Sequence, residues 1–307
     1  WTANCRSGSG SYNGDTIFNF GQRAFNTAAP TGFKALNTAN LPEPTIADGS
    51  KYFDVRSGLT AQFTISDLNF ATGLMAAKST SNDEYWIVAD VVRNNFVGPL
   101  RFNDTNAEGN GAAITNVSAT GYQSDSNWFT NGRTYATFNW DAGTSTVTNN
   151  DGSIASSVRA NPSAGFSICT YTGNGTVGAS IGHGLNDAPG FIIFKNRSDT
   201  ENWFVWHKSF PLPTVNGLYL DLTANVQNFG GTSFNSTLPS SSVITLGNAN
   251  IVNGSGDNML AYCFAPVAGY SAMGSYTGNG STTNPPFVYL GFKPAFLVIK
   301  KTNGGAH

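Results

Sequence analysis

The chain has 307 residues and a formal net charge of −2 at pH 7, and only 11% of its residues are charged. Ordinary globular proteins carry roughly 25% charged residues, so Gly, Asn, Ser and Thr must keep this surface hydrated. No basic stripe is present to neutralise nucleic-acid phosphates, and no run approaches the ~20 apolar residues that cross a bilayer. We therefore expect no nucleic-acid partner and no membrane insertion.

Residues 1–50 differ from the rest of the chain. They contain the run 18–25, which has three Phe, then the run 31–37, and then a stretch bracketed by prolines at 41–49. That stretch is the best linker candidate in the sequence. Because the chain opens on Trp1 and has no initiator Met, we expect it to be an internal piece of something longer.

The remaining residues show the pattern of β-structure. Asn-Gly and Asp-Gly pairs, which suit tight hairpin turns, recur along the chain. Between them lie strand-length runs, among them 135–140, 203–207 and 287–290. Only residues 70–78 could form a short helix, and Gly73 argues against it. The pattern predicts an all-β protein of packed antiparallel sheets.

One phrase, Tyr-Thr-Gly-Asn-Gly, occurs twice, beginning at Tyr171 and again 105 positions later at Tyr276. At the same offset, Pro189 and Pro294 each precede an apolar run that ends in Lys. A constant offset over so many matching positions indicates duplicated domains.

A third, more diverged copy lies upstream. Lys195 and Trp203 are eight positions apart, as are Lys78 and Trp86. The stretch 131–136 loosely parallels 256–261. We therefore expect tandem antiparallel β-sandwich domains, jelly-roll-like in character. The expected boundaries are 1–50 for the N-terminal segment and linker, 51–160 for the first repeat, 161–268 for the second, and 269–307 for the truncated start of a third.

The third repeat is incomplete. The eight-position span from Lys300 would place its Trp one position past His307. A sheet that stopped there would leave unpaired edges. Either the biological chain continues beyond His307, which we favour, or another chain supplies the missing strands.

Three cysteines, Cys5, Cys169 and Cys263, cannot form a disulfide framework. Cys169 and Cys263 both lie in apolar, strand-like segments, which favours buried free thiols. The alternative is a bridge between these two, if the first and last strands of one repeat are neighbours.

The repeated phrase is the best ligand candidate. An aromatic platform with nearby amides suits a sugar, and the residues concerned are Tyr171, Asn174, Tyr276 and Asn279. The opposing interpretation is a strand that ends in a turn with a tucked Tyr. Recurrence in two copies favours the structural interpretation, because turn chemistry recurs wherever the fold does.

Other chemistry finds little support in the sequence. His183 and His207 lack further metal ligands at tight spacing. Residues 104–109 resemble the first half of an EF-hand loop, but Thr115 stands where a bidentate Glu should close it. The stretch 269–273 misses the final Gly of a nucleophile elbow. We expect no metal, no cofactor and no enzymatic activity.

The long motifs resemble a known family. The runs 18–25 and 31–37 resemble the closing segment of SPRY-type β-sandwich domains in bacteriophage tail proteins, with Ala24 where that family usually has Pro. The repeats look like the domain that commonly follows SPRY in marine phage tail and tail-fibre proteins. The stretches that carry this resemblance are 139–143, 150–154, 157–162, 182–185, 195–198 and 261–265.

The resemblance implies a virion structural protein of the tail or a tail fibre, with other copies of itself and other virion proteins as partners and host glycan as a further candidate. It implies no catalytic residue. The first repeat lacks the Tyr-Thr-Gly-Asn-Gly phrase and has 53–58 in its place, which leaves any role for that loop open there. A carbohydrate-binding surface adhesin and a capsid decoration or head-fibre protein remain alternatives.

Overall fold

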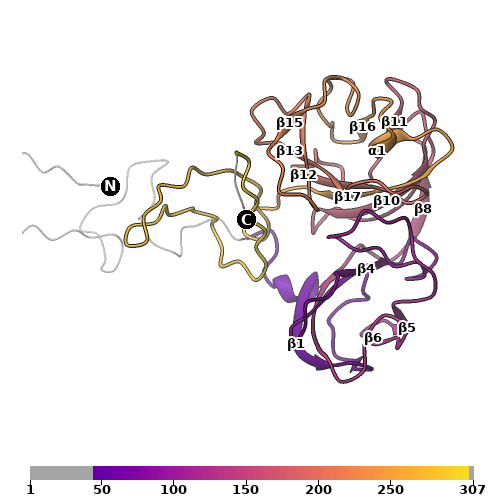
Figure 1. Ribbon diagram of the computed structural model, residues 1–307, viewed down its shortest axis with the longest axis vertical. Helices are drawn as coiled ribbons and strands as arrows, with labels where there is room; N and C mark the ends of the chain where they lie inside the picture. The colour runs from indigo at the N-terminus through magenta and orange to yellow at the C-terminus, as the bar shows by residue number, and fades with distance from the viewer. Residues whose placement is uncertain (1–43, 304–307) are drawn as a thin grey trace, which may run out of the picture. The chain divides into compact units, whose positions relative to one another are not determined.

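The structure is a computed structural model that describes residues 44–303, and these residues belong to one compact unit (Figure 1). Antiparallel strands build it throughout, which confirms the all-β prediction. The SPRY-like runs and Cys5 lie outside the described residues. At the start of the unit, the Asp48 side chain caps a single 3₁₀ turn, η2 (Gly49–Lys51).

The first sandwich consists of a four-stranded and a three-stranded sheet around one core. Strand alternation explains how the core forms, because Tyr135, Thr137 and Asn139 are buried while their neighbours are only partly covered. The four-stranded sheet has the order β1 (Phe53–Thr60), β7 (Thr134–Trp140), β3 (Leu74–Ser79) and β4 (Ile87–Asp90), and the smaller sheet has the order β2 (Thr64–Ile65), β6 (Gly121–Ser124) and β5 (Ile114–Ser118).

The second sandwich consists of an eight-stranded sheet and a two-stranded one. Its core also contains side chains of α1 (Asn250–Asn253), a short helix that the sequence did not predict. The large sheet has the order β15 (Gln227–Asn228), β14 (Asn216–Tyr219), β13 (Phe204–His207), β12 (Phe191–Asn196), β17 (Asn258–Phe264), β10 (Phe166–Thr172), β9 (Ser156–Asn161) and β8 (Thr146–Asn149), and the small sheet pairs β11 (Ser180–Gly182) with β16 (Val243–Thr245).

The two sandwiches repeat one topology. The order β1-β7-β3-β4 recurs as β10-β17-β12-β13, and the pair β2–β6 recurs as β11–β16. The register agrees as well. Leu74 stands opposite Trp140 as Phe191 stands opposite Phe264. This agreement supports the duplication inferred from the sequence.

The strand register shifts the alignment of 131–136 with 256–261 by one residue. Tyr135 stands opposite Ser79, and Met259 stands opposite Asn196 at the matching position. Tyr135 therefore corresponds to Met259, whereas matching 131–136 with 256–261 pairs it with Leu260. The slip matters because one position moves a side chain to the other face of the sheet.

The sheets divide earlier than the expected boundary at 160. β8 and β9 lie within the expected first repeat, yet β9 pairs with β10 and β8 pairs with β9 in the second sheet. A short turn joins β9 to β10, with Gly165 at a φ of 66°. Such tight hairpins keep neighbouring strands in one sheet, so the described strands change sandwich between Trp140 and Thr146.

A third core lies between the sandwiches. Leu74, Val88 and Trp140 of the first sandwich pack with Trp203 and Tyr262 of the second sandwich. Val88 and Val205, which belongs to the same cluster, occupy corresponding positions in β4 and β13. The two sandwiches therefore pack through corresponding sheet faces.

Within 269–303, the expected strands of the third repeat are not formed. Neither 287–290 nor 294–300 belongs to a strand, and Phe287 is 88% exposed. The second sandwich gives a physical reason. There, β10 and β12 do not pair with each other but with β17 between them. No described strand takes the place of β17 beside the segments of the third repeat.

The structure assigns Cys169 and Cys263 as buried free thiols. They face the same core in neighbouring strands, β10 and β17. Across residues 44–303, no helix has the length and apolar character that a membrane span requires.

Candidate functional site

The structure places the first predicted ligand residue, Tyr171, in the core of the second sandwich. Its side chain is buried, and its hydroxyl donates a hydrogen bond to the Val252 carbonyl at 2.5 Å. Burial raises the pKa of Tyr171 well above its ordinary value. The buried ring offers no exposed platform for a sugar, which favours the interpretation of a strand that ends in a turn with a tucked Tyr.

The two asparagines of the repeated phrase make the same turn. Asn174 Oδ1 accepts the Thr176 N–H at 2.9 Å, and Asn279 Oδ1 accepts the Ser281 N–H at 3.0 Å. Such turns are local backbone mimics that asparagine favours. Tyr276 is half-exposed, at 50%. The recurrence has a structural explanation, since each asparagine holds its own loop.

His183 is also structural. The Leu185 N–H donates to Nδ1 at 3.3 Å, and Nε2 lies 3.2 Å from the Ser240 carbonyl. These partners fit a neutral imidazole with its proton on Nε2. Burial lowers the pKa of His183, which favours the same form. Among residues 44–303, no cluster of His, Cys, Asp or Glu is arranged to hold a metal ion.

In the EF-hand-like stretch, residues 104–109, the carboxylates already bind other groups of the protein. Asp104 accepts from Arg101 Nη1 at 3.2 Å and from Asn106 Nδ2 at 2.7 Å. The other acid of this stretch, Glu108, pairs with Arg93 and Arg197. A calcium loop needs its carboxylates turned toward one centre, which these ion pairs prevent.

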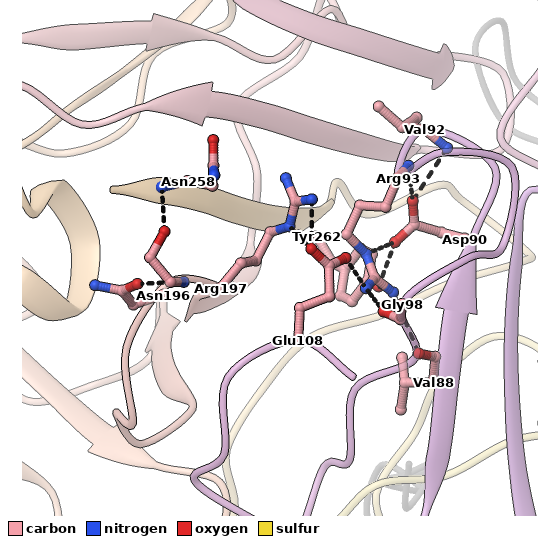
Figure 2. A network of polar contacts seen from close by, with 11 residues as sticks. Val88, Asp90, Val92, Arg93, Gly98, Glu108, Asn196, Arg197, Asn258 and Tyr262 are labelled. Carbon is pink, nitrogen blue, oxygen red and sulfur yellow. Dashed lines mark hydrogen bonds and ion pairs between the residues drawn. The ribbon is translucent and has the colours of Figure 1, made fainter. Parts of the chain in front are cut away.

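The most developed polar site is a network at the junction between the sandwiches, which the sequence did not reveal (Figure 2). Asp90, at the end of β4, accepts from Arg93 Nε at 2.6 Å and from the Tyr262 hydroxyl at 2.7 Å. The N–H groups of Val92 and Arg93 donate to its other oxygen at 3.1 and 2.9 Å. A residue of β17 thus completes an ion pair of the first sandwich.

Glu108 extends this network. Figure 2 shows Arg93 and Arg197, one from each sandwich, both directed at its carboxylate. The distances are 2.9 Å from Arg93 Nη1 and 2.7 Å from Arg197 Nη2. The backbone joins at the same place, since the Glu108 N–H donates to the Arg197 carbonyl at 3.1 Å.

The charges of the network balance. Burial by itself would lower the pKa of Arg93, but the combined interactions with Asp90, Tyr262 and Glu108 outweigh it and raise that pKa above its ordinary value. Two arginines face two carboxylates, and Asp90 and Arg93 are both buried. Breaking a buried pair typically costs about 3–5 kcal/mol, because one charge stays behind without compensation. The arrangement links the two sandwiches through paired charges.

Corresponding lysines hold corresponding loops. Lys195 Nζ donates to the Glu201 and Asn196 carbonyls at 2.8 Å and to the Thr105 carbonyl of the first sandwich at 3.0 Å. Burial lowers the pKa of Lys195 to about 8. In the first sandwich, Lys78 donates to the backbone carbonyl of Glu84. The eight-position Lys-to-Trp span therefore marks a strand end whose lysine anchors the next loop.

Two depressions in the described surface have room for a small ligand. One, of about 150 Å³, lies in the first sandwich and is lined by Pro99, Leu100, Arg101, Asn106, Ala107, Gly109 and Trp128. The other, of about 230 Å³, is polar and lies on the large sheet of the second sandwich, between β8 and Arg197.

Comparison with known proteins assigns the chain to a family without a described activity. No curated protein and no solved structure matches it. One family model, described as "Domain of unknown function (DUF7483)", matches residues 48–307. This match covers most of the chain, including every described strand, so the protein belongs to the DUF7483 domain family.

Proposed function

We propose that this chain is a structural protein of a tailed-bacteriophage virion, located in the tail or a tail fibre. Its role is to space and present surfaces for subunit assembly and for host attachment, without enzymatic activity. The observation that supports this role best is the junction between two sandwiches of one topology. There Asp90 accepts a hydrogen bond from Tyr262 of the second sandwich, and Glu108 pairs with Arg197 of the second sandwich.

The junction favours a mechanical role because it has the properties of a rigid connection. Linked domains that meet through small, polar interfaces move relative to each other. Here an apolar core that includes Trp203 and Tyr262 lies beside the ion network. Opening it would expose both the core and buried charges, so we expect the pair of sandwiches to behave as one stiff body.

The sequence motifs supply the virion context. The repeats and the run 18–25 resemble parts of marine phage tail proteins, and a chain in which only 11% of the residues are charged is typical of stiff extracellular β-proteins.

Location in particles tests the proposal. Antibodies raised against residues 44–303 would be applied to gradient-purified virions, with gold labelling seen by electron microscopy and mass spectrometry of the same fractions. We expect label on the tail. Label on the capsid would favour the decoration protein, label on cell envelopes without particles would favour the adhesin, and absence from particles would refute the proposal.

A further inference from the structure

Because the two sandwiches share one topology, a feature found in both can be explained by the fold. A feature found in only one of them cannot. The strand-end lysine and the following Trp occur in both sandwiches. A cluster of Tyr85, Arg101 and Trp128 occurs only in the first. Such a feature calls for an explanation other than the shared topology.

Strand register identifies the corresponding positions. Val88 bridges to Leu100 as Val205 pairs with Leu218, so Arg101 corresponds to Tyr219. Tyr85 precedes Trp86 as Asn202 precedes Trp203. The second sandwich therefore has neither the arginine nor the first of its aromatic partners.

The cluster is held in a fixed geometry. The guanidinium carbon of Arg101 lies 4.6 Å from the ring centre of Tyr85 and 5.4 Å from that of Trp128. Asp104 Oδ2 accepts from Arg101 Nη1 at 3.2 Å and so orients the guanidinium. The backbone is anchored at the junction, where the Arg101 carbonyl accepts the Trp203 indole N–H at 2.6 Å.

The indole of Trp128 is equally constrained. Its N–H donates to the Asn110 carbonyl at 3.1 Å. Its six-membered ring packs over Gly109, where an added Cβ would lie only 2.7 Å from the ring. A glycine at this position therefore lets the ring lie flat against the backbone while Trp128 still lines the depression.

The depression beside these residues has an apolar wall and a polar rim. Trp128 supplies partly exposed apolar surface above the buried Pro99 and Leu100, while Arg101 and the exposed Asn106 supply hydrogen-bonding groups. Its volume of about 150 Å³ is below the ~300–1,000 Å³ of pockets for drug-sized ligands. It has space for about five waters or for one small ring.

We propose that this depression binds a single saccharide ring of a surface glycan. The C–H face of the ring packs on Trp128, and its hydroxyl groups hydrogen-bond with Arg101 and with the Asn106 amide. Aromatic side chains provide flat apolar surface for such a face, and a few placed polar groups fix its orientation. The inference rests on the host-attachment part of the proposed function and specifies its ligand class and site.

Direct binding tests the site in the whole chain. The probes are methyl pyranosides, neutral and acidic, at millimolar concentration. The readouts are saturation-transfer NMR and the ¹⁵N–¹H signal of the Trp128 indole, assigned with a Trp128→Phe variant. We expect at least one pyranoside to shift this signal, and we expect Arg101→Ala and Asn106→Ala each to weaken binding about tenfold, the effect of losing a good hydrogen bond.

The control is Asn279→Ala, which alters an exposed asparagine of the loop that the sequence suggested for sugar binding. It should leave the affinity unchanged. Equal melting temperatures of the variants would show that lost binding does not reflect unfolding. The inference is overturned if no pyranoside shifts the indole signal, or if binding survives both site variants. In either case tail labelling can still be positive, so the two proposals fail separately.

Discussion

The two sandwiches share strand order and register but differ in how far the same face is covered. Trp203 is 0% exposed and its indole N–H is bonded, whereas Trp86 at the matching position is only partly buried. Trp86 contacts Phe138 at an interplanar angle of 39°, whereas Trp203 stacks on Tyr262 at the corresponding positions with an angle of 18°. The comparison shows that the two copies kept one topology but diverged in how deeply corresponding side chains are buried. Corresponding side chains therefore contribute differently to the free energy of folding.

The largest difference should appear at this tryptophan pair. Trp203→Ala should lower the free energy of unfolding by about 4–5 kcal/mol, because it empties a buried site and removes a hydrogen bond. Trp86→Ala should cost about half as much. Urea denaturation of both variants measures the difference. Equal losses would mean that the faces are equally covered in solution.

The junction gives the next largest effect. Arg93→Met should cost about 3–4 kcal/mol, because it leaves Asp90 buried without its partner. The comparison variant is Arg56→Met, which removes a more exposed pair with Asp54 in β1 and should cost less than about 1 kcal/mol. Similar losses for the two variants, measured in the same denaturation experiment, would contradict a buried network.

The lysines at corresponding positions of the two sandwiches, Lys78 and Lys195, provide a further comparison. Lys195→Met should cost about 2 kcal/mol, because the buried Asn196 carbonyl and the partly buried carbonyls of Glu201 and Thr105 lose their donor. Lys78→Met should cost under about 1 kcal/mol, since its ammonium is partly exposed. Thermal melting can rank the two. A larger loss of stability for Lys78→Met than for Lys195→Met would contradict the deeper burial of Lys195.

The smallest effect concerns pH and belongs to the second sandwich alone. Burial holds the pKa of His183 below its ordinary value of 6.5, so the unfolded chain binds a proton more readily than the folded one. The stabilisation is fully present above pH 6.5 and is lost as the pH falls toward the folded pKa. His183→Gln should reduce this dependence between pH 7 and 5 in denaturation curves. An unchanged slope would assign the dependence to other groups.

Local patterns predicted much of the fold. Alternation placed β7, and the short apolar runs placed β12 and β13, because each run is set by neighbours in the chain. The span from Lys195 to Trp203 located the corresponding strand ends. The boundary near 160 was misplaced because the sequence of β9 does not indicate that this strand pairs with β10 in the second sandwich.

The site could not be predicted in the same way. The sequence offered Tyr171 as a sugar platform because the exposure of a side chain cannot be read from a sequence. In the structure this side chain lies in the core of the second sandwich. Asp90 and Tyr262 meet only through the packing of two distant sheets. For the proposed saccharide site, the sequence contains one indication. Arg101 and Tyr85 have no counterparts in the second copy, so the shared fold does not require them.

The central claim is that the two sandwiches form one rigid body through their junction. Amide hydrogen exchange at increasing denaturant tests it most directly, because it reports the opening free energy of β7 and β17 separately in one sample. We expect the two strands to open with the same free energy, and Arg93→Met to lower both. Separate free energies, with only one strand affected by that substitution, would contradict the claim.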